Sequence, residues 1–250
     1  LGGLRVARDA SGTEHLFGNY QKVGEGMAAS ERGLALFNDA EQIFEPILTY
    51  PADSHFRPEG TPFIYSENGE NYYCFVDRWV PDIRCKTDRA SIMDIAGYET
   101  FTCLREGARL DLENPQLDRD GDGRLQWSWK RNTDPVTDNL NKLIKAGHIQ
   151  PSEAWFRLTD GQTGKPVQSH GATVYWNNYR QRWICLQQEE FGTSWLGEIW
   201  FFEADTPLGP WAYGCKIATH SLKNEVSEAG RRIDEVAAEK GKKAESQSFY

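Results

Sequence analysis

One pattern of strand, polar turn and strand occurs twice in this chain, 111 positions apart. The first copy covers residues 59–76 and the second covers residues 170–187, and the two match position by position in apolar and polar character. An apolar run that turns within a few polar residues and returns as a second apolar run predicts a β-hairpin. Because the same unit recurs along the chain, the sequence predicts a repeat architecture, and the blades of a β-propeller fit it best.

Three stretches of the chain have the character of such blades. Runs of apolar residues on both sides of the turn at 9–12 indicate a further set of strands before the two repeat copies. We therefore expect an all-β fold. Its blades should cover about 4–51, 54–104 and 167–219, and together they form a partial propeller domain over 1–220.

Residues 105–166 fit no blade and are expected to form a mixed insertion. Within them, apolar residues at helical spacing, followed by Gly147 and Pro151, predict a short helix over 138–147. Residues 221–250 are polar, with a few apolar positions at helical spacing. There we expect an exposed helical tail at the start of a truncated final blade.

The charge and the absence of long apolar runs exclude two classes of partner. The chain has 250 residues and a formal net charge of -9 at pH 7, so neither nucleic acid nor an anionic membrane surface is expected to attract it. No apolar stretch approaches the roughly 20 residues of a membrane helix, so membrane insertion is not expected. Neutral and cationic ligands stay open.

The five cysteines form no recognisable site. They show no CxxC spacing and are odd in number, so the sequence indicates neither a zinc site nor a disulfide framework. Cys74 and Cys185 occupy the same place in the two repeat copies and are expected to be small buried hydrophobes. The chain begins at Leu1 and ends at Tyr250 with neither an initiator methionine nor a signal peptide, which is typical of a fragment.

Three motifs resemble those of the five-bladed propeller glycosidases of glycoside hydrolase family 43 and its relatives. The run 57–62 (RPEGTP), followed by a tyrosine-rich strand, is similar to the third-blade motif of that family. The run 169–171 (SHG) resembles the opening of the following blade, and 208–211 (LGPW) resembles a blade-closing turn. The chain is more similar still to uncharacterised bacterial relatives of these propellers. The resemblance implies a five-bladed propeller, of which this chain holds about three blades.

By the same resemblance Glu59 takes the role of the general acid. Glycoside cleavage needs one carboxylic acid to protonate the leaving oxygen and a second carboxylate on the opposite face, about 6.5 to 9.5 Å away when a water attacks. In the family the base and an auxiliary aspartate come from the two preceding blades, which would lie before the first strand of this chain. The alternative is that Glu59 is a solvated carboxylate at the entrance of a strand.

Two further side chains are candidates for contact with the substrate. Arg57 could lower the pKa of Glu59 or bind a sugar, or it could form a surface ion pair. His170 occupies the place of Glu59 in the second copy, so it should point into the same central cavity. In the family a histidine there lies near an axial metal or water, and the alternative is a structural histidine.

The clearest metal signal is the acidic run 118–123 (DRDGDG). Asp118, Asp120 and Asp122 put oxygen ligands at positions 1, 3 and 5 of a tight loop, which is the arrangement that calcium favours. The twelfth position is Trp129 instead of a bidentate glutamate. A structural calcium ion and a plain acidic turn therefore both stay open.

The chain has nine tryptophans, and exposed aromatic faces suit stacking against sugars. Trp127 and Trp129 should face the same way in an extended strand. Most of the tryptophans should be core residues, including Trp183 and Trp200. Trp79 and Trp195 follow strands in connecting regions, so they are the better candidates for ligand contact.

These observations predict a carbohydrate-active propeller whose partner is an oligosaccharide or a polysaccharide. In the first hypothesis it is a glycoside hydrolase with Glu59 as the proton donor. In the second it is a propeller that binds sugar or another partner and does no chemistry. A polymeric substrate would favour an extracellular or periplasmic location.

Overall fold

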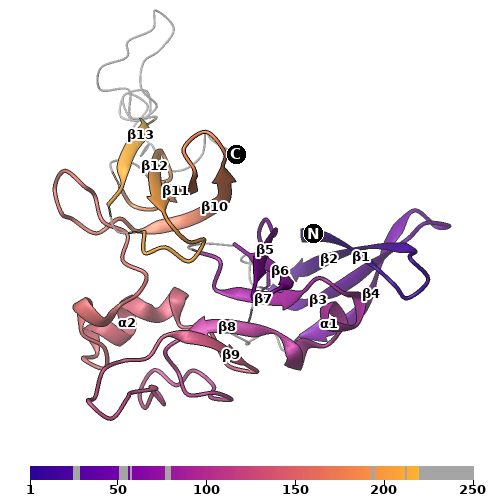
Figure 1. Cartoon of the computed structure of the whole chain (residues 1–250), viewed down its shortest axis with the longest axis horizontal. Coiled ribbons are helices and arrows are strands. Elements are labelled where there is room, and N and C mark those ends of the chain that lie inside the picture. Colours follow the sequence, from indigo (N-terminus) through magenta and orange to yellow (C-terminus); the bar gives the residue numbers. More distant parts are fainter. Residues whose placement is uncertain are drawn as a thin grey trace, which may run out of the picture. The chain divides into compact units, whose positions relative to one another are not determined.

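The computed structural model describes residues 1–24, 29–50, 56, 58–76, 80–192, 195–211 and 213–219. The chain divides into two compact units, Leu1–Trp155 and Phe156–Tyr250. The described strands form three sheets, and every pairing between these strands is antiparallel (Figure 1). The expected all-β class is therefore confirmed. No helix in these ranges has the length and apolar character needed to cross a membrane.

In each sheet the strands lie side by side in chain order, which makes each sheet a meander. The first sheet contains β1 (Gly2–Arg8), β2 (Glu14–Val23), β3 (Ala29–Asn38) and β4 (Ile43–Tyr50). The second contains β5 (Phe63–Glu67), β6 (Glu70–Phe75), β7 (Ile83–Lys86), β8 (Glu99–Thr102) and β9 (Ser128–Arg131). The third contains β10 (Ser169–Asn177), β11 (Arg182–Glu189), β12 (Glu198–Ala204) and β13 (Cys215–Thr219).

The two repeat copies form hairpins with the same pairing register, as the sequence predicts. Phe63 lies opposite Cys74 in the first hairpin, and at the same places Val174 lies opposite Cys185 in the second. The first hairpin closes with a two-residue turn in which Asn68 and Gly69 both have positive φ, the geometry that suits a tight hairpin. The second closes with the four residues 178–181.

The insertion contributes one strand to the second sheet, which the sequence analysis did not foresee. Strand β9 pairs with β8, so Trp129 lies opposite Phe101. The predicted helix is present as the 3₁₀ turn η3 (Thr137–Asn139) and the helix α2 (Leu140–Lys145). It ends at Lys145, and the expected terminating glycine, Gly147, follows two residues later with a φ of 81°. Further short helices are α1 (Arg89–Met93), η2 (Ile95–Gly97) and η4 (Pro151–Glu153).

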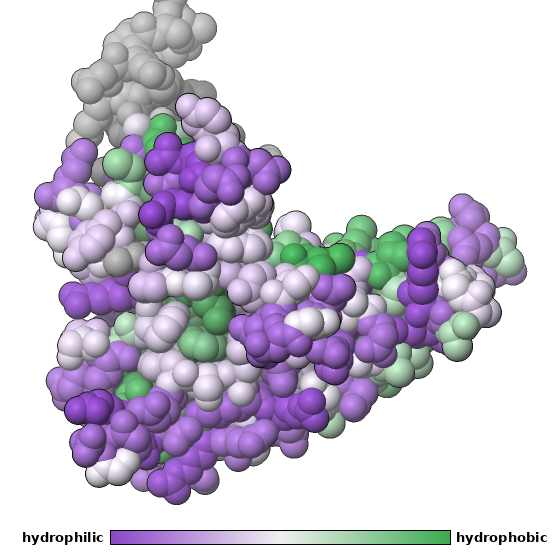
Figure 2. Space-filling model, in the orientation of Figure 1, coloured by the Kyte–Doolittle hydropathy of each residue, from purple (hydrophilic) through white to green (hydrophobic). Residues whose placement is uncertain are grey.

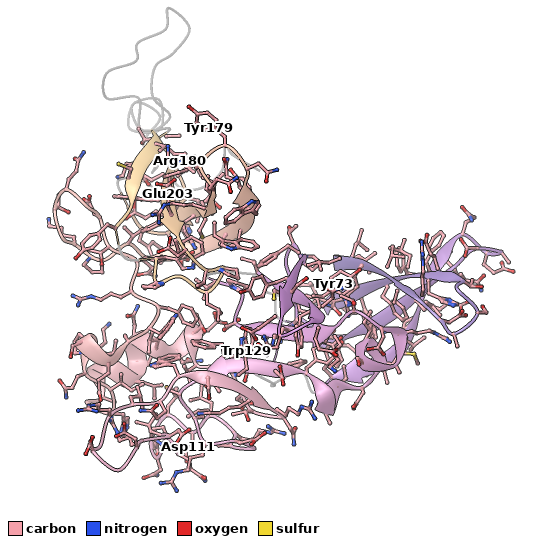
Figure 3. The ribbon with its side chains drawn as sticks, viewed as in Figure 1. Tyr73, Asp111, Trp129, Tyr179, Arg180 and Glu203 are labelled. Atoms are coloured by element: carbon pink, nitrogen blue, oxygen red, sulfur yellow. The ribbon has the colours of Figure 1, made fainter. Side chains whose placement is uncertain are left out.

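The core of the first unit lies between its two sheets. Phe17 and Leu34 from the first sheet pack against Phe75 from the second, and all three are almost fully buried. Tyr73, which is labelled in Figure 3, lies on β6. Its hydroxyl donates a 2.6 Å hydrogen bond to the carbonyl of Val6 on β1. The two meanders are thus joined by apolar contact and by a polar link across the interface.

Strand β1 carries apolar residues on both of its faces. Ala7 faces the core, whereas Leu4 and Val6 point the other way and are 51% and 42% exposed. Figure 2 shows apolar surface over β1 and β2. Apolar side chains on the outer face of a strand are typical of a sheet that is covered on that side too.

The cysteine prediction is confirmed for the two matched residues. Cys74 and Cys185 are buried free thiols, and so are Cys85 and Cys103. Burial raises the pKa of Cys74 and of Cys185 to about 12. These thiols therefore stay protonated and act as small apolar side chains.

The turn after β1 should make stability depend on acid. Asp9 accepts hydrogen bonds from the His15 ring and from Ser11 and Thr13. These contacts, the His15 bond first, hold the pKa of Asp9 well below its usual range.

Because the pKa of Asp9 is lower in the folded state than in the unfolded state, ionised Asp9 stabilises the fold at pH values above the unfolded-state pKa of about 4. This stabilisation is lost as the pH falls below about 4. In urea unfolding at pH values from about 7 to 3, the advantage of the wild type over Asp9→Asn should shrink below about pH 4. The exposed control Asp39→Asn should not change this profile.

Candidate functional site

Glu59 lies just before β5, at the side of the second sheet that contacts the first sheet. Its side chain is 26% exposed, and its Oε1 lies 3.6 Å from the Nε of Arg32 on β3. The Arg32 side chain is only 11% exposed. Glu59 is therefore a partly accessible carboxylate held against a largely buried guanidinium.

The backbone on both sides of Glu59 is bound to the first sheet. The side-chain amide of Asn19, on β2, donates to the carbonyl of Pro58. The backbone N–H of Gly3, on β1, donates to the carbonyl of Gly60 over 2.9 Å. Glu59 is thus held between two hydrogen bonds that come from different strands. We call these two bonds the Glu59 clamps.

Behind the clamps is a buried polar cluster that contains Arg5 and Tyr98. Arg5 donates to the Gly3 carbonyl, to the Asn19 side chain and to the Tyr98 hydroxyl over 2.6, 3.3 and 3.2 Å. Its guanidinium lies 4.9 Å from the centre of the Phe75 ring. Tyr98 in turn donates to the backbone and is almost fully buried. The cluster ties β1 and β2 to Phe75 on β6 and to Tyr98, the residue before β8.

Tyr50, opposite Arg32 in the first sheet, belongs to the same region. Burial raises the pKa of its phenol, and the positive charge of Arg5 opposes the rise. The hydroxyl therefore stays protonated at neutral pH. The region around Glu59 combines a carboxylate, a guanidinium and a neutral phenol.

Two of the candidate residues from sequence analysis, Arg57 and Trp79, lie outside the described residues. The expected helical tail, 221–250, lies outside them too. Glu59 belongs to the first unit, whereas His170 and Trp195 belong to the second, so the two groups are described separately.

In the second unit His170 and Trp195 are both accessible. The His170 Nδ1 is 3.9 Å from the Glu190 carboxylate, too far for a hydrogen bond, and the side chain is 38% exposed. Trp195 is 46% exposed, and its ring centre lies 5.5 Å from that of Phe191. Phe191 has a φ of 58°, which is unusual for a bulky residue. An exposed aromatic pair thus lies on the loop between β11 and β12.

Two acidic residues that the sequence analysis did not single out lie close together below this loop. Glu189 and Glu198 are directly opposite each other on β11 and β12, and Glu198 is fully buried. A Cβ added to Gly192 would be 2.7 Å from one carboxylate oxygen and 2.8 Å from the other, so these oxygens are at most 5.5 Å apart, the sum of the two. Glu189 accepts from the Trp200 indole over 2.6 Å and lies 3.7 Å from the Lys216 ammonium. The feature of the sequence that could have identified them is that Glu189 ends one strand and Glu198 begins the next.

The remaining tryptophan predictions can be compared with the rings that each one contacts. Trp127 and Trp129 both contact Phe101, at 6.1 and 5.5 Å between ring centres, so they do face the same way. The Trp127 indole also donates to a backbone carbonyl. These two side chains pack within the protein. Trp200 is buried as expected, and Trp183 is half-buried beside another indole.

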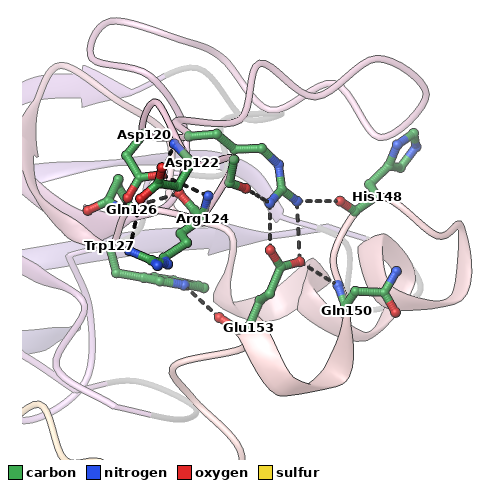
Figure 4. A network of polar contacts seen from close by, with 10 residues as sticks. Asp120, Asp122, Arg124, Gln126, Trp127, His148, Gln150 and Glu153 are labelled. Atoms are coloured by element: carbon green, nitrogen blue, oxygen red, sulfur yellow. Dashed lines mark hydrogen bonds and ion pairs between the residues drawn. The ribbon is translucent and has the colours of Figure 1, made fainter.

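The acidic run forms a turn stabilised by its own side chains (Figure 4). Asp120 accepts from the backbone N–H groups of Asp122 and Arg124 and from the Gln126 amide. Asp118 points elsewhere and pairs with Lys130 over 2.8 Å. Within the described ranges, no three acidic, histidine or cysteine side chains come together as metal ligands.

The carboxylates of this turn already have partners in the described structure. Asp118 pairs with Lys130, and Asp120 accepts hydrogen bonds within its own loop. From this geometry we expect that about 1 mM calcium leaves the thermal unfolding midpoint of the wild type unchanged. A rise that is present in the wild type and absent in Asp120→Asn would contradict this expectation.

Comparison with known proteins does not add to this description. No family model, curated protein or solved structure matches the chain.

Proposed function

We propose that this chain is part of a carbohydrate-active, five-bladed β-propeller in which Glu59 contacts the saccharide. The observation that supports this most is the environment of the Glu59 carboxylate, which is partly exposed, paired with Arg32 and fixed by hydrogen bonds on both sides of its backbone. Carboxylate and guanidinium groups together donate and accept the hydrogen bonds that sugar hydroxyls make. A fixed backbone supports a defined orientation of the ligand.

The propeller assignment goes beyond the all-β class and has its own support. Each sheet is a meander, and the apolar outer face of β1 favours a further sheet that packs against it. The motifs described above add the resemblance to five-bladed glycosidases. In such a propeller the starts of the inner strands would face a common axis.

In the hydrolytic form of the proposal, Glu59 is the general acid. It gives its proton to the leaving glycosidic oxygen as the bond to the anomeric carbon breaks, and a second carboxylate takes a proton from the attacking water. That second carboxylate would come from another blade. For this role Glu59 must be protonated in part of the molecules.

The second candidate function is saccharide binding without cleavage, and the Arg32 contact favours it. A guanidinium beside a carboxylate stabilises the ionised form, which accepts hydrogen bonds from sugar hydroxyls but cannot donate a proton. A binder needs no second carboxylate. The two candidates therefore differ in whether Glu59 transfers a proton.

Turnover of a panel of oligosaccharides and alkyl glycosides separates these candidates, because the leaving oxygen of these substrates has to be protonated. If Glu59 is the general acid, Glu59→Gln should lower turnover by about 10²-fold or more, because glutamine cannot donate the proton. Glu70→Gln is the matched control, since Glu70 lies in the adjacent hairpin and forms an exposed pair with Lys86. Equal turnover by the wild type and Glu59→Gln would remove Glu59 from the chemistry. No turnover combined with measurable saccharide binding would favour the binder.

A further inference from the structure

Arg5 is a buried cation with only neutral hydrogen-bond acceptors. It is 2% exposed, and within the described part of the chain no carboxylate lies within 4.0 Å of its side-chain nitrogens. It donates to two oxygens of the first sheet and to the Tyr98 hydroxyl, and its Nε has no acceptor. An unpaired buried charge costs several kcal/mol, so an apolar residue of similar size would often serve stability better. Its contacts therefore call for an explanation beyond stability.

The groups that Arg5 binds are the same groups that hold Glu59. Its Nη1 donates to the carbonyl of Gly3, the residue whose N–H forms one of the Glu59 clamps. Its Nη2 donates to the side-chain oxygen of Asn19, whose amide forms the other clamp. The planar guanidinium can donate in two fixed directions at once, which a lysine cannot do.

The geometry of Gly3 shows how tightly this region is built. Gly3 has a φ of 59°, and a Cβ there would lie 2.7 Å from the Asn19 amide nitrogen and 3.2 Å from the Pro58 oxygen. The clamp from Gly3 to Gly60 therefore passes directly beside the clamp from Asn19 to Pro58. A small displacement of either strand would change both.

We propose that Arg5 is the positioning residue of the Glu59 site, because it fixes both clamps and through them the orientation of the Glu59 carboxylate. This inference rests on the proposed function, because the orientation of Glu59 affects ligand binding only if Glu59 contacts a saccharide. Arg5 itself touches no substrate in this account. It acts through Gly3 and Asn19.

Three variants of the full chain test the inference. Arg5→Lys keeps the positive charge and loses the simultaneous hydrogen bonds to the Gly3 carbonyl and the Asn19 side chain. Asn19→Asp keeps the acceptor for Arg5 and gains an ion pair with it, and it breaks the other clamp directly, because the donor to Pro58 becomes an oxygen that the Pro58 carbonyl repels. Arg84→Lys is the control, because Arg84 is equally buried in the same unit and contacts Glu67 and Glu99 instead.

Two measurements report on position and on ligand separately. Hydrogen exchange of the Gly3 amide reports on the clamp from Gly3 to Gly60. The NMR titration of the Glu59 carboxyl carbon reports on the surroundings of the Glu59 carboxylate. Arg5→Lys should speed Gly3 exchange by about tenfold or more relative to Arg84→Lys. Arg5→Lys and Asn19→Asp should both move the Glu59 titration midpoint, and should weaken saccharide binding by about tenfold or more.

The outcomes separate the inference from the proposed function. If the wild type binds no saccharide but the exchange and titration changes occur only in the Arg5 and Asn19 variants, the positioning role holds and the saccharide function fails. If the wild type binds saccharide and these variants leave exchange, titration and affinity as in Arg84→Lys, the positioning role is overturned. Equal changes in Arg84→Lys would also overturn it, since the effect would then follow any loss of stability.

Discussion

Replacing Arg84 with leucine is expected to lower the free energy of unfolding of the first unit by about 3 kcal/mol or more. Arg84 is 5% exposed and pairs with Glu67 over 2.6 Å and with Glu99 over 2.7 Å. Its guanidinium lies between the rings of Tyr72 and Trp129, at 4.0 and 4.1 Å from their centres. Leucine would remove the cation that pairs with Glu67, would leave Glu99 with the more distant Arg131 at 3.6 Å, and would remove both cation–π contacts.

Urea unfolding of the full chain measures this change. Arg8→Leu is the matched control, because the Arg8 pair with Glu14 is exposed and such pairs contribute about 0 to 1 kcal/mol. Arg84→Lys should fall between the wild type and Arg84→Leu, since it keeps the charge but not the planar group. Similar midpoints for Arg84→Leu and Arg8→Leu would show that the contacts of Arg84 contribute little.

Replacing Gly33 with alanine is expected to destabilise the first sheet by about 3 kcal/mol. A Cβ at Gly33 would lie 2.0 Å from the Leu48 carbonyl oxygen and 2.6 Å from the Tyr20 ring. The oxygen belongs to the backbone of the paired strand, so β3 and β4 would have to separate. Arg32 directly precedes Gly33 on β3, so the change should also shift the Arg32 guanidinium that pairs with Glu59.

Gly2→Ala provides the control for Gly33→Ala in the same sheet, because a Cβ at Gly2 meets nothing within 4 Å. Thermal or urea unfolding should separate the two variants clearly. Saccharide affinity should fall in Gly33→Ala even at a temperature where the variant is fully folded. A Gly33→Ala protein with wild-type stability would mean that the strands at this point are less closely packed than described.

The sequence predicts local structure in this chain well where the signals are local. The alternation of apolar residues and the turn at Asn68 and Gly69 lead directly to the first hairpin, and its match leads to the second in the same register. The helix at α2 follows from apolar spacing and from Gly147. Strand β9 has only four residues inside an irregular segment, so its pairing with β8 depends on contacts that no short window contains.

The surroundings of Glu59 depend on contacts between distant parts of the chain. The resemblance of the 57–62 run points to Glu59, but Arg5, Asn19 and Arg32, which surround it, lie on three of the four strands of a separate sheet. Each of these three residues looks like an ordinary surface residue in the sequence. They form a cluster only because one sheet packs on the other, and that packing cannot be inferred from their spacing along the chain.

The measurement that tests the account most directly is calorimetric titration of oligosaccharides into the wild type, Glu59→Gln and Glu70→Gln. The account predicts that the wild type and Glu70→Gln bind a common saccharide with the same affinity. It also predicts that Glu59→Gln binds it about tenfold or more weakly, because an ionised acceptor beside Arg32 is replaced by a neutral amide. Equal affinity for all three proteins, or no binding by the wild type to any neutral or acidic oligosaccharide, would contradict the claim that Glu59 lies in a saccharide site.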